Sequence, residues 1–165
     1  SLDVTMFETL AKYKKPYVLM HMQGNPATMQ TNPHYAHCVN EVYYWFTEKI
    51  NALKQLGLCD IILDFGFGFG KTQAHNYELL SAMPHFTFLD LPILAGISRK
   101  SMVYKALNIE PNDALNGTSA LHMVALQNGA KLLRVHDVKE AQQVIRLYEL
   151  LSEHSYKPQE LNTHF

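Results

Sequence analysis

Four short apolar segments of this chain each end in polar side chains that could do chemistry. An acid, several cations and two histidines stand at these ends: His21, Gln23 and Asn25; then Asp64; then Ser98, Arg99, Lys100 and Ser101; and last Arg134, His136 and Asp137. If the segments are strands of one parallel sheet, their carboxyl ends share one edge. The sequence therefore predicts one site in which a carboxylate meets several cations.

Asp64 opens a loop in which Phe and Gly alternate from Phe65 to Gly70. Gly lets a ligand approach the main chain, and Phe offers flat apolar surface. A phosphate-binding GxxxxGK[ST] loop needs Gly at position 65, and a dinucleotide-binding GxGxxG needs Gly at position 71, where Phe65 and Lys71 stand. The triplet Asp64-Phe65-Gly66 also occurs in kinases, but the rest of their signature is absent. What favours a site here is an acid at the end of a strand beside the loop.

Two basic segments each have a functional and a structural interpretation. Residues 98–101 lie at a strand-to-helix junction, where helix amides, Arg99 and Lys100 would favour an anion; the alternative is a solvated basic turn. Arg134 and His136 alternate along the chain and point the same way, which suits a phosphate. The alternative is that His136 only caps or packs.

Other polar residues have structural interpretations. We expect His21 to be a core or rim histidine, because no set of His, Cys and carboxylates has zinc spacing. Asp137 is expected to cap a helix. Cys38 and Cys59 form no CxxC pair, and two buried free thiols in a reducing compartment, the cytoplasm, are the expectation.

The composition fits one soluble globular domain that spans residues 1–165. Of these residues 47% are hydrophobic and 18% charged, and the formal net charge is −1. That charge favours neither nucleic acid nor a membrane as a partner. No apolar run approaches transmembrane length, and the N-terminal residues do not resemble a signal peptide.

Helix-period and strand-length patterns alternate along the chain. The patterns predict strands at residues 17–22, 60–63, 92–97 and 131–135, and helices at 3–13, 32–53 with Asn32 as cap, 75–83 ended by Pro84, 101–107, 113–128 and onward from Asp137. The last helix would bury Val138, Ala141, Val144, Ile145, Tyr148 and Leu151. The βα repeats predict an α/β fold with a parallel sheet covered by helices, either a small open sheet or half of an eight-stranded barrel.

Four motifs in this order resemble the dihydropteroate synthase family. They are Leu19-Met20-His21-Met22-Gln23-Gly24, Asp64 with Gly66-Phe67-Gly68-Phe69-Gly70-Lys71, Gly96-Ile97-Ser98-Arg99-Lys100-Ser101, and Arg134-Val135-His136-Asp137-Val138. The last two separate the chain from the pterin-binding methyltransferase domains, which are the alternative within the same fold. The resemblance implies the C-terminal half of a TIM (β/α)8 barrel. It also implies condensation of 6-hydroxymethyl-7,8-dihydropterin diphosphate with 4-aminobenzoate, which gives dihydropteroate and pyrophosphate.

The resemblance also implies a role for each site residue. The pterin would be bound by Met20, Asp64, Gly96, Lys100 and Arg134, the aminobenzoate by Gly68, Phe69 and Ser101, and the diphosphate by Arg134 and His136. Lys100, Arg134 and His136 would be the catalytic residues. The family's magnesium-binding Asn and mobile loops belong to its first four βα units, so no metal ligand is expected in this chain.

This chain departs from the family at position 65, where the family has Pro and this chain has Phe65. We expect the Phe to add bulk near the pterin pocket.

A second expectation concerns what the chain does on its own. Without the first half of the barrel, we expect no synthase turnover. A non-catalytic half-barrel that binds a pterin or another anion is the alternative, and a homodimer is the expected assembly.

Overall fold

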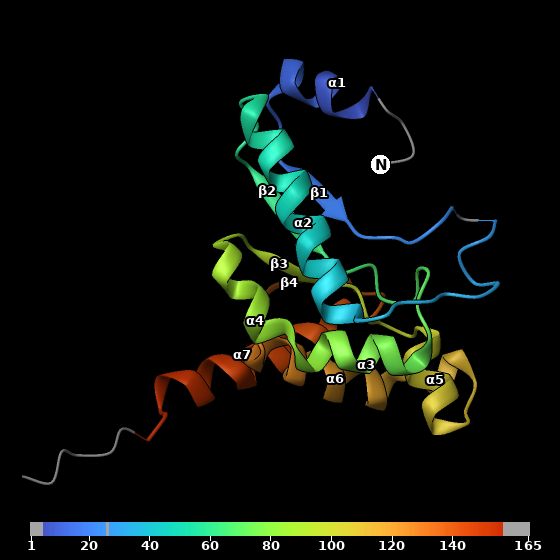
Figure 1. Ribbon diagram of the computed structural model, residues 1–165. Coiled ribbons are helices and arrows are strands. Elements are labelled where there is room, and N and C mark those ends of the chain that lie inside the picture. The colour runs from blue at the N-terminus through green and yellow to red at the C-terminus, as the bar shows by residue number, and fades with distance from the viewer. Residues whose placement is uncertain (1–4, 26, 157–165) are drawn as a thin grey trace, which may run out of the picture.

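The computed structural model describes residues 5–25 and 27–156 (Figure 1). Helices and strands alternate in the order α1 (Met6–Tyr13), β1 (Tyr17–Met20), α2 (Cys38–Gln55), β2 (Ile61–Asp64), α3 (Gln73–Ser81), α4 (Met83–Phe86), β3 (Ile93–Ala95), α5 (Ser101–Leu107), α6 (Leu115–Gln127), β4 (Ala130–Leu133) and α7 (Val138–Glu153). Short 3-10 helices, η1 (Thr87–Leu89) and η2 (Pro111–Asp113), precede β3 and α6. The expectations for residues 3 and 4 lie outside the described residues.

The four strands form one parallel sheet in the order β1-β2-β3-β4. Met20 is the register partner of Asp64, and Asp64 is the partner of Leu94. Beyond the last residue of β4, the Arg134 amide donates to the Ala95 carbonyl at 3.0 Å. All four carboxyl ends therefore meet at one edge, and the predicted βα order is confirmed.

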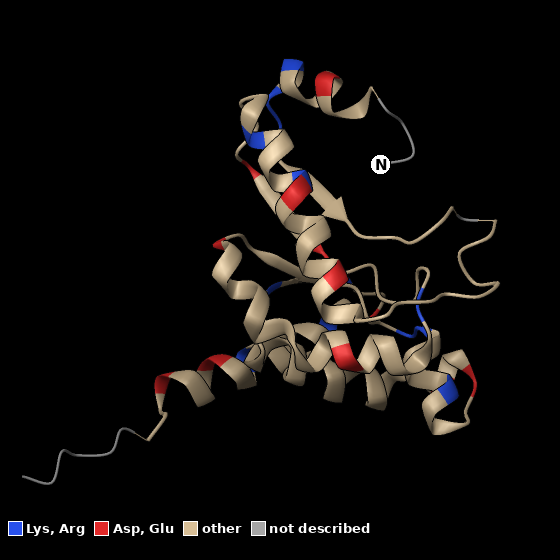
Figure 2. Cartoon of the chain, viewed as in Figure 1, with Lys and Arg blue, Asp and Glu red and all other residues tan. Residues whose placement is uncertain are grey.

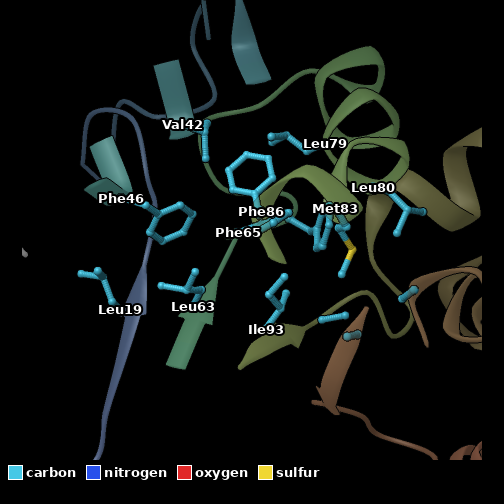
Figure 3. Packing of buried hydrophobic residues seen from close by; sticks show 14 of the residues in the cluster. Leu19, Val42, Phe46, Leu63, Phe65, Leu79, Leu80, Met83, Phe86 and Ile93 are labelled. Atoms are coloured by element: carbon cyan, nitrogen blue, oxygen red, sulfur yellow. The ribbon is translucent and has the colours of Figure 1, made fainter. Parts of the chain in front are cut away.

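The main core lies between one face of the sheet and the helices. On that face Leu19, Leu63 and Ile93 are buried together with Phe46 of α2 and Met83 of α4 (Figure 3). The alternating residues face the other way: Val18 and Leu132 are exposed, Ile62 is partly buried and Leu94 is buried. Strands that are apolar on both faces are typical of sheets covered on both faces. Here the exposure of Val18 and Leu132 leaves the second apolar face only partly covered by the described residues.

The start of α2 differs from the prediction. The helix begins at Cys38 rather than near residue 32. The Gln23 side chain binds the main chain of His34, accepting from its N–H at 3.1 Å and donating to its carbonyl at 2.7 Å. The buried Tyr35 donates its hydroxyl to the Gly70 carbonyl at 2.8 Å. These contacts from distant loops hold the segment in a non-helical course.

Two further predictions about helix ends were wrong. Pro84 does not end a helix but lies in the first turn of α4, where its missing N–H costs no hydrogen bond. Asp137 occupies the N-cap position of α7, but its side chain makes no capping hydrogen bond and binds Arg99 instead. The strand ends lie within two residues of the prediction.

Exposure on α7 and at one cysteine also differs from the prediction. Of the expected inner face, Ala141 and Val144 are buried, whereas Val138 and Leu151 are exposed. Cys59 is an exposed free thiol, and only Cys38 is buried. The helix therefore buries a narrower stripe than its sequence predicts.

Charged residues of both signs are interspersed along the described helices and loops (Figure 2). Among residues 5–25 and 27–156, no helix combines the length and the apolar character needed to cross a membrane.

Candidate functional site

Asp64, the last residue of β2, is fully buried. Its Oδ1 accepts the Gly66 amide at 2.9 Å, and its Oδ2 lies 2.7 Å from a guanidinium nitrogen of Arg134. That guanidinium is close enough for an ion pair but aims no N–H at Oδ2, which accepts no hydrogen bond from the described residues. This oxygen is buried beneath the guanidinium, so a ligand N–H can reach it only when Arg134 moves aside.

Arg134 reaches Asp64 across Gly96, the residue that follows β3. A Cβ at Gly96 would lie 2.6 Å from one guanidinium nitrogen of Arg134. Only a residue without a side chain leaves room for the guanidinium to lie on this backbone. Gly66 is constrained in the same loop cluster: its φ is +61°, and a Cβ there would lie 2.0 Å from the His21 carbonyl oxygen.

Lys100 contributes a second cation close to the Gly-Phe loop. Its Nζ donates to the Phe67 carbonyl at 2.6 Å and lies 4.7 Å from the centre of the Phe69 ring, within cation–π range. Burial lowers the pKa of Lys100, Asp64 partly opposes this shift and Arg134 adds to it, so that the pKa is about 8. Lys100 is therefore still a cation at neutral pH.

These side chains surround a pocket of about 390 Å³ at the carboxyl edge of the sheet. Its lining residues are Met20, Phe69, Ser98, Lys100, Arg134, Val135 and His136. Five of these seven were predicted as site residues, and Ser98 and Val135 were not assigned a role. Asp64 and Gly96 contact Arg134 and do not line the pocket themselves.

A second pocket has a volume of about 350 Å³, and Lys71, Ser101 and Lys105 are among its lining residues. The three residues expected around aminobenzoate are not in one pocket. Phe69 lines the first pocket and Ser101 the second. Gly68 lines neither, and its amide donates to the Asn76 side chain at 2.7 Å.

Lys71 is a residue that the sequence argument missed. Its ammonium is buried inside the loop, 3.0 Å from Nδ1 of His21, and donates to the carbonyls of Phe69 at 3.0 Å and Gly66 at 3.2 Å. Burial lowers the pKa of Lys71 to about 8. Burial, and then the charge of Lys71, lowers the pKa of His21 to about 3, so the ring is neutral. His21 is buried, in keeping with the expected core or rim histidine. The available signal was a Lys that directly follows the last Gly of a loop.

The predicted role of Phe65 was wrong. Its side chain is fully buried, and its ring lies 4.5 Å from Phe86 and 5.8 Å from Phe46, measured between ring centres (Figure 3). Phe65 therefore adds bulk to the main core and none to the pocket. Of the three loop phenylalanines, only Phe69 offers surface to a ligand, since Phe67 is also buried.

Arg99 does not join the cations of the pocket. Its guanidinium forms two hydrogen bonds of 2.8 Å with the Asp137 carboxylate and also donates to the carbonyls of Pro111 and Asn112. These bonds raise the pKa of Arg99 and lower that of Asp137. The anion site expected at residues 98–101 therefore depends on Lys100, while Arg99 connects the loops that follow β3 and β4.

The described residues contain no group of three or more His, Cys, Asp or Glu placed to hold a metal ion. The one buried carboxylate of the site, Asp64, has both oxygens contacted by protein groups. These side chains do not fit a magnesium site of their own.

A pocket lined by two cations, one of them paired with a buried carboxylate, at the carboxyl edge of parallel βα units defines a barrel-type α/β protein with a ligand site. Comparison with known proteins narrows this class. Residues 1–136 match the family described as pterin binding enzyme. The chain belongs to the pterin binding enzyme family.

Named relatives agree with this assignment. The chain is 44% identical over 144 residues to the dihydropteroate synthase of Escherichia coli strain K12, a match that covers 86% of this chain and 51% of the relative. A Yersinia pestis dihydropteroate synthase solved with a sulfonamide drug superposes with a TM-score of 0.86 and 39% identity, covering 89% of this chain and 54% of that one. For a Xanthomonas albilineans dihydropteroate synthase in complex with 7,8-dihydropteroate, the TM-score is 0.82, the identity 36%, and the coverage 91% and 55%.

This chain spans about half the length of the curated relatives it matches. The fold is accordingly half of the barrel of these synthases, as predicted.

Proposed function

We propose that this chain forms the pterin-binding half of a dihydropteroate synthase. The supporting observation is the buried carboxylate of Asp64, whose Oδ2 accepts no hydrogen bond from the described residues and is paired with Arg134, which lines the pocket together with Lys100. The complete enzyme would be a transferase that joins 6-hydroxymethyl-7,8-dihydropterin diphosphate to 4-aminobenzoate.

The proposed pterin contacts follow from the polarity of the ring. Asp64 accepts hydrogen bonds from the amino and ring N–H groups of the pterin, a donor pair that a fixed carboxylate matches. Lys100 donates to the acceptor edge of the ring. Met20 contacts the flat ring, and Arg134 moves off Asp64 and stacks on it. Gly96 provides the close backbone approach that the guanidinium needs.

The chemical step is a substitution at the methylene carbon of the pterin. A bond forms between this carbon and the amine nitrogen of aminobenzoate, and the bond between the carbon and the diphosphate oxygen breaks. Pyrophosphate leaves with the electron pair, and the amine loses a proton. Arg134 and His136 stabilise the charge that develops on the leaving group, while Lys100 holds the ring in place.

The aminobenzoate would lie beside the Gly-Phe loop, between Phe69 of the first pocket and Ser101 of the second. Phe69 contacts its ring from one side, Gly68 borders it with main-chain atoms, and Ser101 at the start of α5 faces its carboxylate. The separation of these residues supports a site that is completed by loops from the other half of the barrel.

Three further properties belong to the proposal. Magnesium assists the complete enzyme through a ligand outside this chain, because the described residues do not fit it. The assembly is a homodimer, which the exposed Leu147 and Leu151 on α7 support. The compartment is the cytoplasm, which the two free cysteines support.

The proposal is tested by rebuilding the barrel from two polypeptides. One is this chain, and the other is the part of the Escherichia coli dihydropteroate synthase that lies outside the match. The mixture is supplied with both substrates and magnesium, and pyrophosphate release is measured. We expect release from the mixture and none from either polypeptide alone.

Asp64→Ala is the matched variant, since it removes the carboxylate and keeps all the residues that line the pocket. It should abolish pterin binding in titration calorimetry as well as turnover. Lys139→Ala, an exposed change on α7, should alter neither. Pterin binding without turnover in the rebuilt barrel would favour the non-catalytic binding module, and pterin binding unchanged by Asp64→Ala would remove this residue from the site.

A further inference from the structure

Ser98 links the loop after β3 to the loop after β4 at the edge of the pocket. Its side chain is buried, and its Oγ makes two contacts with one residue, His136. The backbone N–H of His136 donates to Oγ at 3.2 Å, and Nδ1 of the same histidine lies 3.0 Å from Oγ. The hydroxyl thus contacts both the main chain and the ring of His136.

The direction of the second hydrogen bond follows from the donors available. An amide N–H can only donate, so Oγ is the acceptor of the first bond. A serine hydroxyl has a single proton, and no other hydrogen bond of this hydroxyl is found among the described residues. Leaving that proton without an acceptor in a buried position would cost free energy. The hydroxyl therefore donates to Nδ1.

A neutral His136 whose Nδ1 accepts a hydrogen bond must carry its proton on Nε2. His136 lines the pocket together with Arg134 and Lys100. With Nδ1 turned to Ser98, the ring has Nε2–H as its remaining donor. A donor placed beside two cations suits the oxygen atoms of an anionic group.

The adjacent residues in both loops make the contact rigid. Arg99 is bound to Asp137 by two hydrogen bonds of 2.8 Å, so residues 98 and 99 pair with residues 136 and 137 in succession. The Arg99 amide also donates to the buried Thr118 hydroxyl at 3.1 Å. The Ser98 hydroxyl is therefore held in a fixed position relative to the ring of His136.

We propose that Ser98 is a positioning residue that fixes the ring plane and the Nε2–H tautomer of His136, so that the ring donates to an anionic phosphate group in the pocket. The assignment of that group as the leaving diphosphate rests on the proposed function. The contact between Ser98 and His136 does not, and the two can be tested separately.

The first test is long-range ¹H–¹⁵N NMR of the histidine side chains in the rebuilt barrel, with no substrate present. The His136 signals are assigned by their loss in His136→Gln. At a pH where the ring is neutral, we expect a protonated Nε2 and a hydrogen-bonded, unprotonated Nδ1. Ser98→Ala should shift the Nδ1 resonance, and Ser98→Thr, which keeps the hydroxyl, should restore it. A protonated Nδ1 in the unsubstituted protein would overturn the proposal, as would a resonance that Ser98→Ala leaves unchanged.

The second test is a double-mutant cycle on pyrophosphate affinity, measured by calorimetry. Ser98→Ala should weaken binding about tenfold, as expected for loss of one well-oriented hydrogen bond to an anion, and Ser98→Thr should bind normally. In the His136→Gln background, Ser98→Ala should have no further effect, because Ser98 acts through the ring. If the loss of pyrophosphate affinity in the double variant equals the product of the losses in the two single variants, Ser98 acts independently of His136 as a packing residue, and the proposal is overturned.

If the rebuilt barrel binds no pyrophosphate, the proposed function fails and the NMR result alone decides about Ser98. If pyrophosphate binds and the NMR signature is absent, the proposed function stands and the role of Ser98 fails.

Discussion

The Arg134 guanidinium lies 2.7 Å from Oδ2 of Asp64. In the proposed function, the same carboxylate would accept the N–H groups of a pterin. The Asp64 side chain is fully buried, whereas 48% of the Arg134 side chain is exposed. The carboxylate is thus fixed and the arginine has room to move. The guanidinium neutralises a buried charge that would otherwise be costly, and the proposed pterin would have to replace it there.

Substitution of Gly96 tests this arrangement. In Gly96→Ala the new methyl group would meet the guanidinium at 2.6 Å and push Arg134 away from Asp64. Displaced in this way, Arg134 could not lie on the Gly96 backbone and stack on the pterin, so we expect pterin affinity to fall about tenfold in calorimetry on the rebuilt barrel. In an Arg134→Ala background the clash is gone, so Gly96→Ala should cost nothing more. An equal loss in both backgrounds would show that Gly96 contacts the ligand directly.

Substitution of Arg99 tests the connection between the two loops. Lys in its place cannot form the paired hydrogen bonds with Asp137 or reach the carbonyls of Pro111 and Asn112 at the same time. Arg99→Lys should therefore lower the urea midpoint of unfolding and weaken pyrophosphate binding. Arg146→Lys is the control, because Arg146 is exposed and its ion pair with the exposed Glu149 is long, at 3.4 Å. Such a pair contributes little, so the urea midpoint of this variant should stay unchanged. Similar behaviour of the two variants would contradict a role for Arg99 in holding the loops.

The buried His21 predicts a loss of stability in acid. The pKa of His21 is about 3 in the folded chain, whereas its ordinary value, which applies to the unfolded chain, is 6.5. As the pH falls, the unfolded chain therefore binds a proton at this residue before the folded chain does. The contribution of His21 to the free energy of unfolding is therefore fully present above pH 6.5 and is lost progressively as the pH falls from 6.5 toward 3. At pH 4.5 we expect the free energy of unfolding to be about 2–3 kcal/mol lower because of His21.

His21→Gln should show a shallower decline, since Gln does not titrate and can still accept from Lys71. The measurement is urea unfolding at pH 7 and pH 4.5. His154→Gln, at an exposed residue that follows α7, should leave the decline unchanged. The assignment of the effect to His21 is wrong if both variants behave alike.

Removal of the buried ammonium should loosen the Gly-Phe loop. Lys71→Met leaves the carbonyls of Gly66 and Phe69 and Nδ1 of His21 without their donor. We expect a loss of about 2–4 kcal/mol in the free energy of unfolding and faster amide exchange in residues 66–70. Lys139→Met, at an exposed residue in the first turn of α7, should change neither.

The lowered pKa of Lys71 also predicts how the free energy of unfolding changes in alkaline solution. The pKa of Lys71 is lowered to about 8 from its ordinary value of 10.5, so between these pH values the unfolded chain holds a proton that the folded chain has lost. The unsubstituted chain should therefore gain stability between pH 8 and 10.5 through this residue. The gain should be smaller in Lys71→Met, and equal slopes in the two proteins would contradict the lowered pKa.

The sequence by itself determined the architecture and the location of the site. Apolar runs of strand length that alternate with helix-period segments specify parallel βα units, and the carboxyl ends of such units must share one edge. Asp64, Lys100, Arg134 and His136 could therefore be assigned to one region from their positions after the strands. These inferences depend only on local periodicity and on the geometry of a parallel sheet.

The tertiary structure alone decided which partner each side chain has. Phe65 turns into the core because Phe46 and Phe86 arrive from α2 and α4. Asp137 has the position of a helix cap, but Arg99, 38 residues earlier, offers a charged partner with two hydrogen bonds. Lys71 and Ser98 acquire their roles only from His21 and His136, on other loops. Local patterns contain no information on such partners, since burial and charge pairing depend on residues that are distant in the chain.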